Sequence, residues 1–468
     1  MERLKPMDAQ FVDAENEDRQ ASFAIASIAI FEGPAPSYGE FYAAIEGRLA
    51  LVPIYRRKLR QVPLGLGPPV WVDDPNFDLA YHLRQTAVPA PGSDEQLANL
   101  IARVMAQRLD RDFPLWEYWL VEGLAEGRWA LISKVHHCMV DGISGTDLYR
   151  VIFDLSPEPA PATMDTRKAP AEPSSLALAA SAAVDMVTRP AKGAAALAGA
   201  LTRPRETLRQ ATQTARAVAR LAGSALPATG SSLSGPIGRQ RRYAWARCSL
   251  DEVKAIKREL GGTVNDVVLA AISSGFRALL LSRGEEPAPH MLPSLIPVSL
   301  RAPGEENLYD NRVSVVLADL PVHVADPLER LAAIRAEMSE LKAVREASAA
   351  EALIALGQYT PFPLASLTVR LAYRLPQQQI VTVTTNVPGP QVPLYGLGRR
   401  LMEIIPYVPI ATSMRTGVSI FTYCGQMTFG ITADYATSPD VGILARGIEE
   451  GVRELTEEVR RRRPGDAA

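Results

Sequence analysis

Two adjacent histidines and an aspartate follow an apolar run in the first third of the chain. The run begins at Trp129 and leads into His136, His137, Asp141 and Gly142, in a chain with only five histidines. Histidine is the side chain best suited to proton transfer near neutral pH. Because successive side chains of a strand point to opposite faces, the two rings cannot both face one substrate. We therefore expect one histidine to be catalytic, as a general base, and the other to be structural.

Other chemistries fit this cluster less well. A zinc site needs converging ligands, whereas adjacent histidines on a strand diverge, so we expect no metal. A nucleophilic Cys138 would need a base within hydrogen-bond reach, and His137 points away from it in an extended chain. A buried histidine held only by the backbone is the remaining alternative. The sequence has no G-x-S-x-G elbow, phosphate loop or complete G-x-G-x-x-G, which argues against serine hydrolases, P-loop enzymes and Rossmann dehydrogenases.

Composition narrows the class of protein further. The 468 residues include 50 Lys and Arg against 52 Asp and Glu, and 47% are hydrophobic, which is typical of a soluble globular protein and gives no basic field for nucleic acid. Cys138, Cys248 and Cys424 are widely spaced, so we expect a reducing compartment without disulfides. The N-terminus lacks the order of a secretory signal. These features predict a cytoplasmic protein.

The order of elements predicts a mixed α/β fold in two halves. Residues 1–160 alternate strand and helix patterns, with a strand over 23–31 and a helix over 97–109 that Ser93 and Gln96 cap. Residues 161–240 form an Ala- and Pro-rich connector, and the α/β pattern resumes over 241–468. There we expect a helix capped by Ser249 and ended by Gly261, a second helix capped by Thr263, and a terminal helix from about Asp440. Strands are expected over residues 294–300, 313–320 and 380–385, with a hairpin over 417–434.

The motifs of the chain resemble those of one enzyme family. The segment from His136 to Gly142 matches HHxxxDG, the motif of coenzyme-A-dependent acyltransferases related to chloramphenicol acetyltransferase and to condensation domains. Further segments resemble motifs of the bacterial wax ester synthase/diacylglycerol acyltransferases, and they include Pro114-Leu115-Trp116, Asn265-Asp266, Ile296-Pro297-Val298-Ser299-Leu300-Arg301, Asn386-Val387-Pro388-Gly389-Pro390 and Ser438-Pro439-Asp440. The similarity covers nearly the whole chain.

This resemblance implies two chloramphenicol-acetyltransferase-like subdomains, with mixed sheets flanked by helices and a long crossover between them. It also implies transfer of a long-chain fatty acyl group from acyl-coenzyme A, as substrate, to diacylglycerol or a long-chain alcohol, without cofactor or metal. His137 would be the general base and His136 a supporting residue. Asp141 would orient the loop through an ion pair with Arg301, and Gly142 would allow a close backbone approach.

Four further residues are candidates for substrate binding, each with a structural alternative. Asn265 and Asp266 lie in the first turn of a helix, where they would position the thioester or only stabilise the helix end. Asn386 would orient substrate or form a turn. Trp116 would contact substrate or pack in the core.

The region after the first half carries a candidate lipid contact. The segment from Asp185 to Arg220 contains seven basic and only two acidic residues, interspersed with Ala, Val and Leu. It would form either a helix that rests on anionic lipid or a solvated connector. We therefore expect a cytoplasmic protein at the inner face of the plasma membrane or on lipid inclusions, of undetermined oligomeric state. The alternatives are a polyketide-derived alcohol, sugar or amine as acceptor, or a non-catalytic lipid-surface protein, against which the intact His137 and Asp141 argue.

Overall fold

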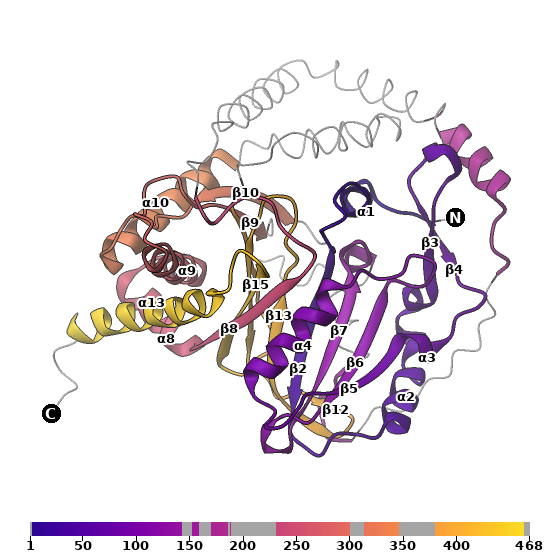
Figure 1. The fold of residues 1–468 in the computed structure, drawn as a ribbon, viewed down its shortest axis with the longest axis horizontal. Helices are drawn as coiled ribbons and strands as arrows, with labels where there is room; N and C mark the ends of the chain where they lie inside the picture. The colour runs from indigo at the N-terminus through magenta and orange to yellow at the C-terminus, as the bar shows by residue number, and fades with distance from the viewer. Residues whose placement is uncertain are drawn as a thin grey trace.

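The computed structural model of the chain describes residues 2–142, 152–158, 170–185, 188, 231–299, 313–345 and 380–462. Within these residues the chain forms two halves, each built on a six-stranded sheet, and a three-stranded sheet at the edge of the N-terminal half. Figure 1 shows the two large sheets side by side. The predicted mixed α/β class is therefore confirmed.

The sheet of the N-terminal half has the order β12-β13-β2-β7-β6-β5. Its strands are β2 (Ala24–Phe31), β5 (Leu83–Ala87), β6 (Trp116–Glu122), β7 (Trp129–His136), β12 (Tyr395–Gly396) and β13 (Arg399–Tyr407). β5 and β6 are parallel and the other neighbours are antiparallel. All eight residues of β7 are buried, as in a strand covered on both faces, and its last residue pairs with the first of β2. The end of β7 is thus fixed inside the sheet.

Helices surround this sheet. They are α1 (Pro6–Glu17), α2 (Tyr38–Glu46), α3 (Leu79–His82) and α4 (Asp94–Ala106), with the 3-10 turns η1 (Leu49–Leu51), η2 (Pro53–Arg56), η3 (Pro63–Gly65), η4 (Ala125–Gly127) and η5 (His137–Gly142). The predicted capping box of Ser93 and Gln96 is confirmed, and it begins α4 at Asp94, three residues before the predicted start. The helix ends at Ala106 instead of 109, where the buried Lys134 of β7 donates to the carbonyls of Val104 and Gln107.

The sheet of the C-terminal half has the order β10-β9-β11-β14-β15-β8. Its strands are β8 (Arg241–Ser249), β9 (Pro293–Ser299), β10 (Val313–Asp319), β11 (Thr382–Val387), β14 (Thr416–Tyr423) and β15 (Gln426–Asp434). β11 is parallel to β9 and β14, and the remaining pairs are antiparallel. The predicted strands are present as β9, β10 and β11, although β11 covers Thr382–Val387 instead of 380–385 and residue 300 lies outside the described residues. The predicted hairpin over 417–434 is confirmed, with its turn at Gly425.

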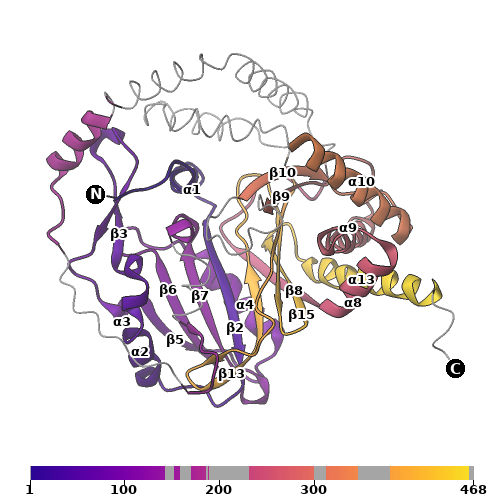
Figure 2. The same cartoon turned by 180° about the vertical axis from the view of Figure 1, so that it is seen from behind.

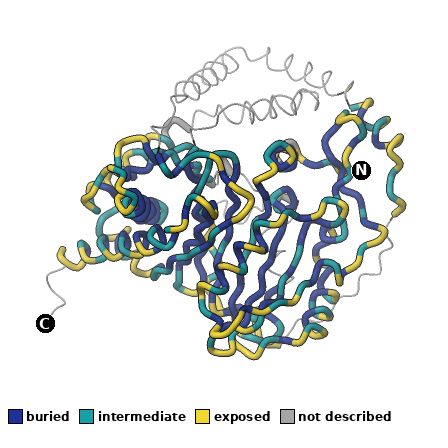
Figure 3. Tube along the Cα trace, in the orientation of Figure 1, coloured by how far each residue is buried: buried dark blue, intermediate teal, exposed yellow. Residues whose placement is uncertain are grey.

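Among the described residues of this half, four helices pack on the second sheet, namely α8 (Leu250–Leu260), α9 (Val264–Ser282), α10 (Pro327–Arg345) and α13 (Val441–Arg462). Ser249 caps α8, and Gly261 ends it at a φ of 80°. α9 lies against α13 because glycines allow a close approach: a Cβ at Gly275 would lie 2.8 Å from Ile448 Cγ1. Figure 3 shows the buried trace of α9 and of both sheets, with exposed residues along the outside of the helices.

α9 also has the length and hydropathy of a membrane span. Among the helices that the structure describes, it is the one that meets both criteria, with a mean hydropathy of 1.5. However, 72% of that window is buried inside the protein, between α10 and α13. The apolar composition of α9 is therefore accounted for by its place in the core.

A strand exchange joins the two halves. β12 and β13 follow β11 in the chain, yet they extend the N-terminal sheet, with β13 paired to β2. β13 also packs on the C-terminal sheet at Gly430, where a Cβ would lie only 1.8 Å from Pro406 O. β13 was not predicted from the sequence. The predicted domain boundaries at residues 160 and 240 remain predictions. The two halves are linked both by the chain itself and by the pairing of β13 with β2.

Part of the predicted connector belongs to the folded body. The helix Ser175–Asp185 packs its Leu178 and Ala182 on the small sheet of β1 (Glu2–Arg3), β3 (Arg57–Arg60) and β4 (Val70–Asp73). Figure 2 shows this helix beside the loop between β3 and β4. The proposed lipid-binding segment between Asp185 and Arg220 lies almost wholly outside the described residues.

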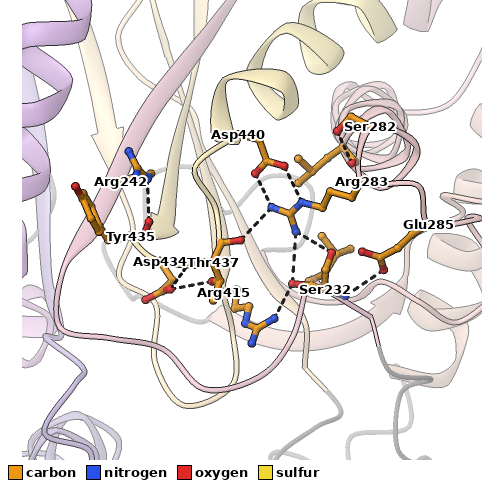
Figure 4. A network of polar contacts seen from close by, with 12 residues as sticks. Ser232, Arg242, Ser282, Arg283, Glu285, Arg415, Asp434, Tyr435, Thr437 and Asp440 are labelled. Atoms are coloured by element: carbon orange, nitrogen blue, oxygen red, sulfur yellow. Dashed lines mark hydrogen bonds and ion pairs between the residues drawn. The ribbon is translucent and has the colours of Figure 1, made fainter.

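The chain re-enters the C-terminal half through a polar network (Figure 4). The guanidinium of Arg283 donates to both carboxylate oxygens of Asp440, at 2.8 and 2.6 Å, and to Ser232 Oγ at 2.8 Å. Arg415 donates to the backbone carbonyl of Ser232, and the Glu285 carboxylate accepts from the backbone N–H of Ser232. The start of α13 and the end of the connector are thus held by the same arginine.

Candidate active site

The two histidines sit at the transition from β7 to η5. The backbone N–H of His136 donates to Leu115 O and that of His137 to Phe23 O, both at 2.9 Å. These bonds fix the backbone of both residues between neighbouring segments, so the two side chains leave from defined positions.

His136 points into the protein. It is 1% exposed, and its Nδ1 accepts a hydrogen bond of 3.2 Å from the backbone N–H of Cys138. Nδ1 also lies 3.0 Å from Cys138 Sγ, and Nε2 lies 3.6 Å from Glu15 Oε2. The ring is therefore enclosed between Cys138 and Glu15.

Glu15 of α1 is the centre of this buried polar group. Its carboxylate accepts from Phe23 N at 3.1 Å and from the guanidinium of Arg111 at 2.5 Å. Burial acts to raise the pKa of Glu15, but hydrogen bonding and electrostatic attraction from His136 and Arg111 outweigh it and lower the pKa to about 2. Glu15 is thus ionised at neutral pH.

His137 has a different environment. It is half-buried, and its ring stacks on that of Phe11, with 4.0 Å between centroids and 26° between planes. Stacking occupies a face of the imidazole, whereas the ring nitrogens lie in its plane. Of the two adjacent histidines, His137 is the more accessible.

The cysteine beside them is unsuited to nucleophilic attack. Cys138 is 2% exposed, and burial raises the pKa of its thiol well above the ordinary value. A protonated, enclosed thiol does not act as a nucleophile.

Asp141 and Gly142 close η5. The side chain of Asp141 and the whole of Arg301 lie outside the described residues. The ion pair between them, and the role of Gly142, therefore remain predictions.

In the C-terminal half the structure brings two predicted residues together. Asn386 near the end of β11 donates from Nδ2 to Asn265 Oδ1 at the start of α9, at 3.4 Å. Both are half-buried. Asp266 is engaged differently, because its carboxylate accepts from Thr263 N at 2.7 Å in a capping box that begins α9. The structure thus shows the helix-stabilising contact of Asp266, whereas the two asparagines form a polar pair between two motifs.

Trp116 lies in an aromatic core. Its ring is 0% exposed, stacks between Tyr55 and His82, and donates from Nε1 to Tyr55 O. This environment corresponds to the core-packing alternative for Trp116 and leaves no exposed surface for a substrate.

The residues that surround the histidines were not predicted from the sequence. Phe11 and Glu15 come from α1, more than a hundred positions earlier in the chain, and Lys134 lies on β7. A signal was present for Lys134, since a lysine inside an apolar strand implies a buried partner. In the described part of the chain, no group of three or more His, Cys, Asp or Glu side chains is placed to hold a metal ion.

Comparisons with known proteins identify the family. Residues 4–268 match the wax ester synthase/diacylglycerol acyltransferase catalytic domain, and residues 309–456 match the C-terminal domain of this family. A putative diacylglycerol O-acyltransferase of Mycobacterium bovis is 40% identical over 475 residues, covering 99% of this chain and 97% of the relative. The probable diacylglycerol O-acyltransferase tgs1 of Mycobacterium tuberculosis shows the same identity and coverage.

Solved structures agree with this assignment. The wax ester synthase/diacylglycerol acyltransferase of Marinobacter aquaeolei VT8 is 25% identical with a TM-score of 0.68, covering 98% of this chain and 99% of that one. The starter condensation domain of rhizomide synthetase, in complex with C8-CoA and Leu-SNAC, shares the fold with a TM-score of 0.57 and 16% identity, over 98% and 94% of the two chains. The chain therefore belongs to the wax ester synthase/diacylglycerol acyltransferase family and is an O-acyltransferase.

Proposed function

We propose that this enzyme transfers a long-chain fatty acyl group from acyl-coenzyme A to the free hydroxyl of diacylglycerol, and also accepts long-chain alcohols. The names of its relatives support diacylglycerol as acceptor, and the coenzyme A complex of the condensation domain supports a thioester donor. The observation that carries the mechanism is the contrast at the end of β7, where His136 is enclosed and His137 is half-exposed.

In this mechanism His137 takes the proton of the acceptor hydroxyl. The oxygen then attacks the thioester carbonyl carbon, the C–S bond breaks, and the coenzyme A thiolate recovers the proton from the imidazolium. General-base catalysis of this kind contributes about 10²–10⁴-fold, and holding the two substrates together contributes roughly 7–11 kcal/mol. Attack is direct, without an acyl-enzyme, which agrees with the enclosed Cys138.

The asparagine pair lies in the motifs at β11 and α9 and is proposed to orient substrate. An amide can donate to a thioester oxygen, and Asn265 and Asn386 fix each other by their hydrogen bond. The ion pair of Asp141 and Arg301 is proposed to hold η5.

We also propose peripheral contact with a lipid surface on the cytoplasmic side. The helix Ser175–Asp185 exposes Leu176 and Val184 at 80% and 61% on the side away from its packed Leu178. Flotation with vesicles tests this contact: Leu176→Ser with Val184→Ser should weaken binding, and unchanged flotation would contradict a role for this helix.

The reaction is tested with labelled palmitoyl-coenzyme A and either dioleoylglycerol or hexadecanol, comparing wild type with His137→Ala. His290→Asn is the matched control, since His290 lies exposed in the other half. Labelled triacylglycerol from wild type and His290→Asn, but not from His137→Ala, is expected. Release of coenzyme A without either product would indicate a different acceptor, such as a polyketide-derived alcohol, sugar or amine. No consumption of thioester by wild type would favour a non-catalytic lipid-surface protein.

A further inference from the structure

One face of α1 contacts both histidines. Phe11 and Glu15 are four residues apart, so their side chains leave the same side of the helix. Phe11 stacks on the ring of His137, and Glu15 lies beside Nε2 of His136. Figures 1 and 2 show α1 lying across the ends of β2 and β7. Two rings that leave the chain in different directions are therefore both held by a single helix.

Glu15 also acts on the backbone of the site. Its Oε1 accepts from Phe23 N, and the carbonyl of the same Phe23 accepts from His137 N. The Glu15 carboxylate thus fixes Phe23, and the carbonyl of Phe23 fixes the backbone of His137. Arg111 completes the group, because its guanidinium balances the buried charge of Glu15.

α1 is itself held by both halves of the molecule. The loop after α1 receives Arg108 from the N-terminal half, which donates to Ala21 O at 2.8 Å. Arg241 of β8 donates to Gln20 O at 2.7 Å, and Asp18 accepts from Thr412 N at 3.0 Å. The orientation of α1, and of the rings it touches, therefore depends on the correct assembly of the two halves.

We propose that Phe11 and Glu15 are positioning residues of the acyl-transfer site. Phe11 holds the imidazole of His137 by stacking, and Glu15 holds His136 and the end of β7. This inference rests on the proposed function of His137 as general base. A base must be oriented closely to act. The ring of Phe11 packs on one face of the imidazole of His137 and so restricts the rotation of the His137 side chain.

The test compares Phe11→Leu with Phe113→Leu. Phe113 is the matched control because it is also half-buried and stacks on an aromatic ring, that of Tyr81, at 3.9 Å. Phe11→Leu should lower kcat for triacylglycerol formation by about tenfold or more, since a small misplacement of a reacting group costs up to about a hundredfold. KM for acyl-coenzyme A should stay unchanged, and Phe113→Leu should keep the wild-type kcat.

Two further variants separate positioning from folding. Phe11→Trp keeps an aromatic ring and should recover most of kcat, whereas Phe11→Met should behave as Phe11→Leu and replaces it if the leucine variant does not fold. Glu15→Gln keeps the size of the side chain but removes the negative charge beside Arg111 and Nε2 of His136. It should lower kcat with unchanged KM. Wild-type kcat in Phe11→Leu or Phe11→Met would overturn the role of Phe11, and wild-type kcat in a folded Glu15→Gln would overturn that of Glu15.

A double variant shows whether Phe11 acts through His137. In the His137→Ala background, Phe11→Leu should not lower the residual rate further, because the ring it positions is absent. If the residual rate falls by the same factor as in wild type, Phe11 acts elsewhere and the inference is wrong. If His137→Ala alone is fully active, the proposed function fails first, and this outcome is distinct from a normal Phe11→Leu beside an inactive His137→Ala.

Discussion

Lys134 in the N-terminal half and Arg330 in the C-terminal half are both buried cations that donate to backbone carbonyls, but they differ in what they adjoin. In the N-terminal half, Lys134 is 0% exposed and donates to Val104 O and Gln107 O at 2.9 and 2.7 Å. In the C-terminal half, Arg330 is 2% exposed and donates to Val324 O and Ala325 O at 3.2 and 3.1 Å. Both cations hold a segment next to a helix end.

The difference lies in their neighbours along the chain. Lys134 lies on β7 two residues before His136, so the contact that ends α4 also fixes the strand that delivers the histidines. Arg330 lies on α10 and bonds to Glu454 of α13, within the helical layer. Lys134 thus adjoins the residues proposed for acyl transfer, whereas Arg330 stabilises the packing of two helices.

Substitution of Glu15 is expected to change the stability of the protein more than any other change considered for the two halves. Lowering its pKa from 4.5 to about 2 corresponds to roughly 3 kcal/mol of stability at neutral pH. Because the folded-state pKa is depressed, this stability is fully present above pH 4.5 and is lost as the pH falls toward 2. The free energy of unfolding of wild type and Glu15→Gln should therefore differ at pH 6, and the difference should shrink in acid.

Urea unfolding at a series of pH values measures that difference. Glu454→Gln is the matched variant of the C-terminal half, and its loss should be about 0–1 kcal/mol because Glu454 is 35% exposed. A gap between wild type and Glu15→Gln that stays constant down to pH 3 would contradict the buried charge.

The buried cations give the next largest effect. Lys134→Met and Arg330→Met each leave two carbonyls without their donor, so each should lose about 1–3 kcal/mol of stability. Only Lys134→Met should also lower kcat, since only Lys134 holds the strand that ends in His136. Unfolding and acyl transfer are measured on the same preparations, and equal loss of kcat in both variants would remove the distinction between the halves.

Lys134 should also make the stability of the protein depend on pH in the alkaline range. Burial, opposed by Glu117 and Glu15, lowers the pKa of Lys134 from 10.5 to about 8. Between these values the unfolded chain binds more protons than the folded one, so stability should rise with pH across this window. Lys134→Met should lack this rise, and a rise of the same size in the variant would assign it to another group.

Substitution of the asparagine pair, Asn265 and Asn386, is expected to have the smallest effect on stability. A double-mutant cycle of Asn265→Ala and Asn386→Ala should show a coupling of about 0.5–1.5 kcal/mol in stability, as for one hydrogen bond. If the pair also orients substrate, each single variant should raise KM for acyl-coenzyme A. Additive effects on both quantities would show that the contact at 3.4 Å carries no function.

The sequence predicted best what depends on neighbouring residues. The capping box of Ser93 and Gln96, the cap at Thr263 and the hairpin turn at Gly425 each involve residues at most three apart, and the structure contains all of them. Helix ends were less accurate, because the end of α4 is set by Lys134 from another element.

Long-range pairings were not predictable from one sequence. β13 joins β2 across more than 370 positions, and its sequence carries no mark of its partner. Phe11 and Glu15 reach the histidines only through the path of α1 over the sheet. The HHxxxDG motif identified His136 and His137, but it did not indicate which helix holds them or that Trp116 would be enclosed in an aromatic core.

The separate roles of the adjacent histidines are tested by measuring kcat and thermal unfolding for His137→Gln and His136→Gln side by side. We expect His137→Gln to lose kcat by about 10²-fold or more while its unfolding temperature stays close to that of wild type. His136→Gln should mainly lower the unfolding temperature, because its ring fills a buried site beside Glu15. An active His137→Gln beside a stable but inactive His136→Gln would show that His137 is not the base.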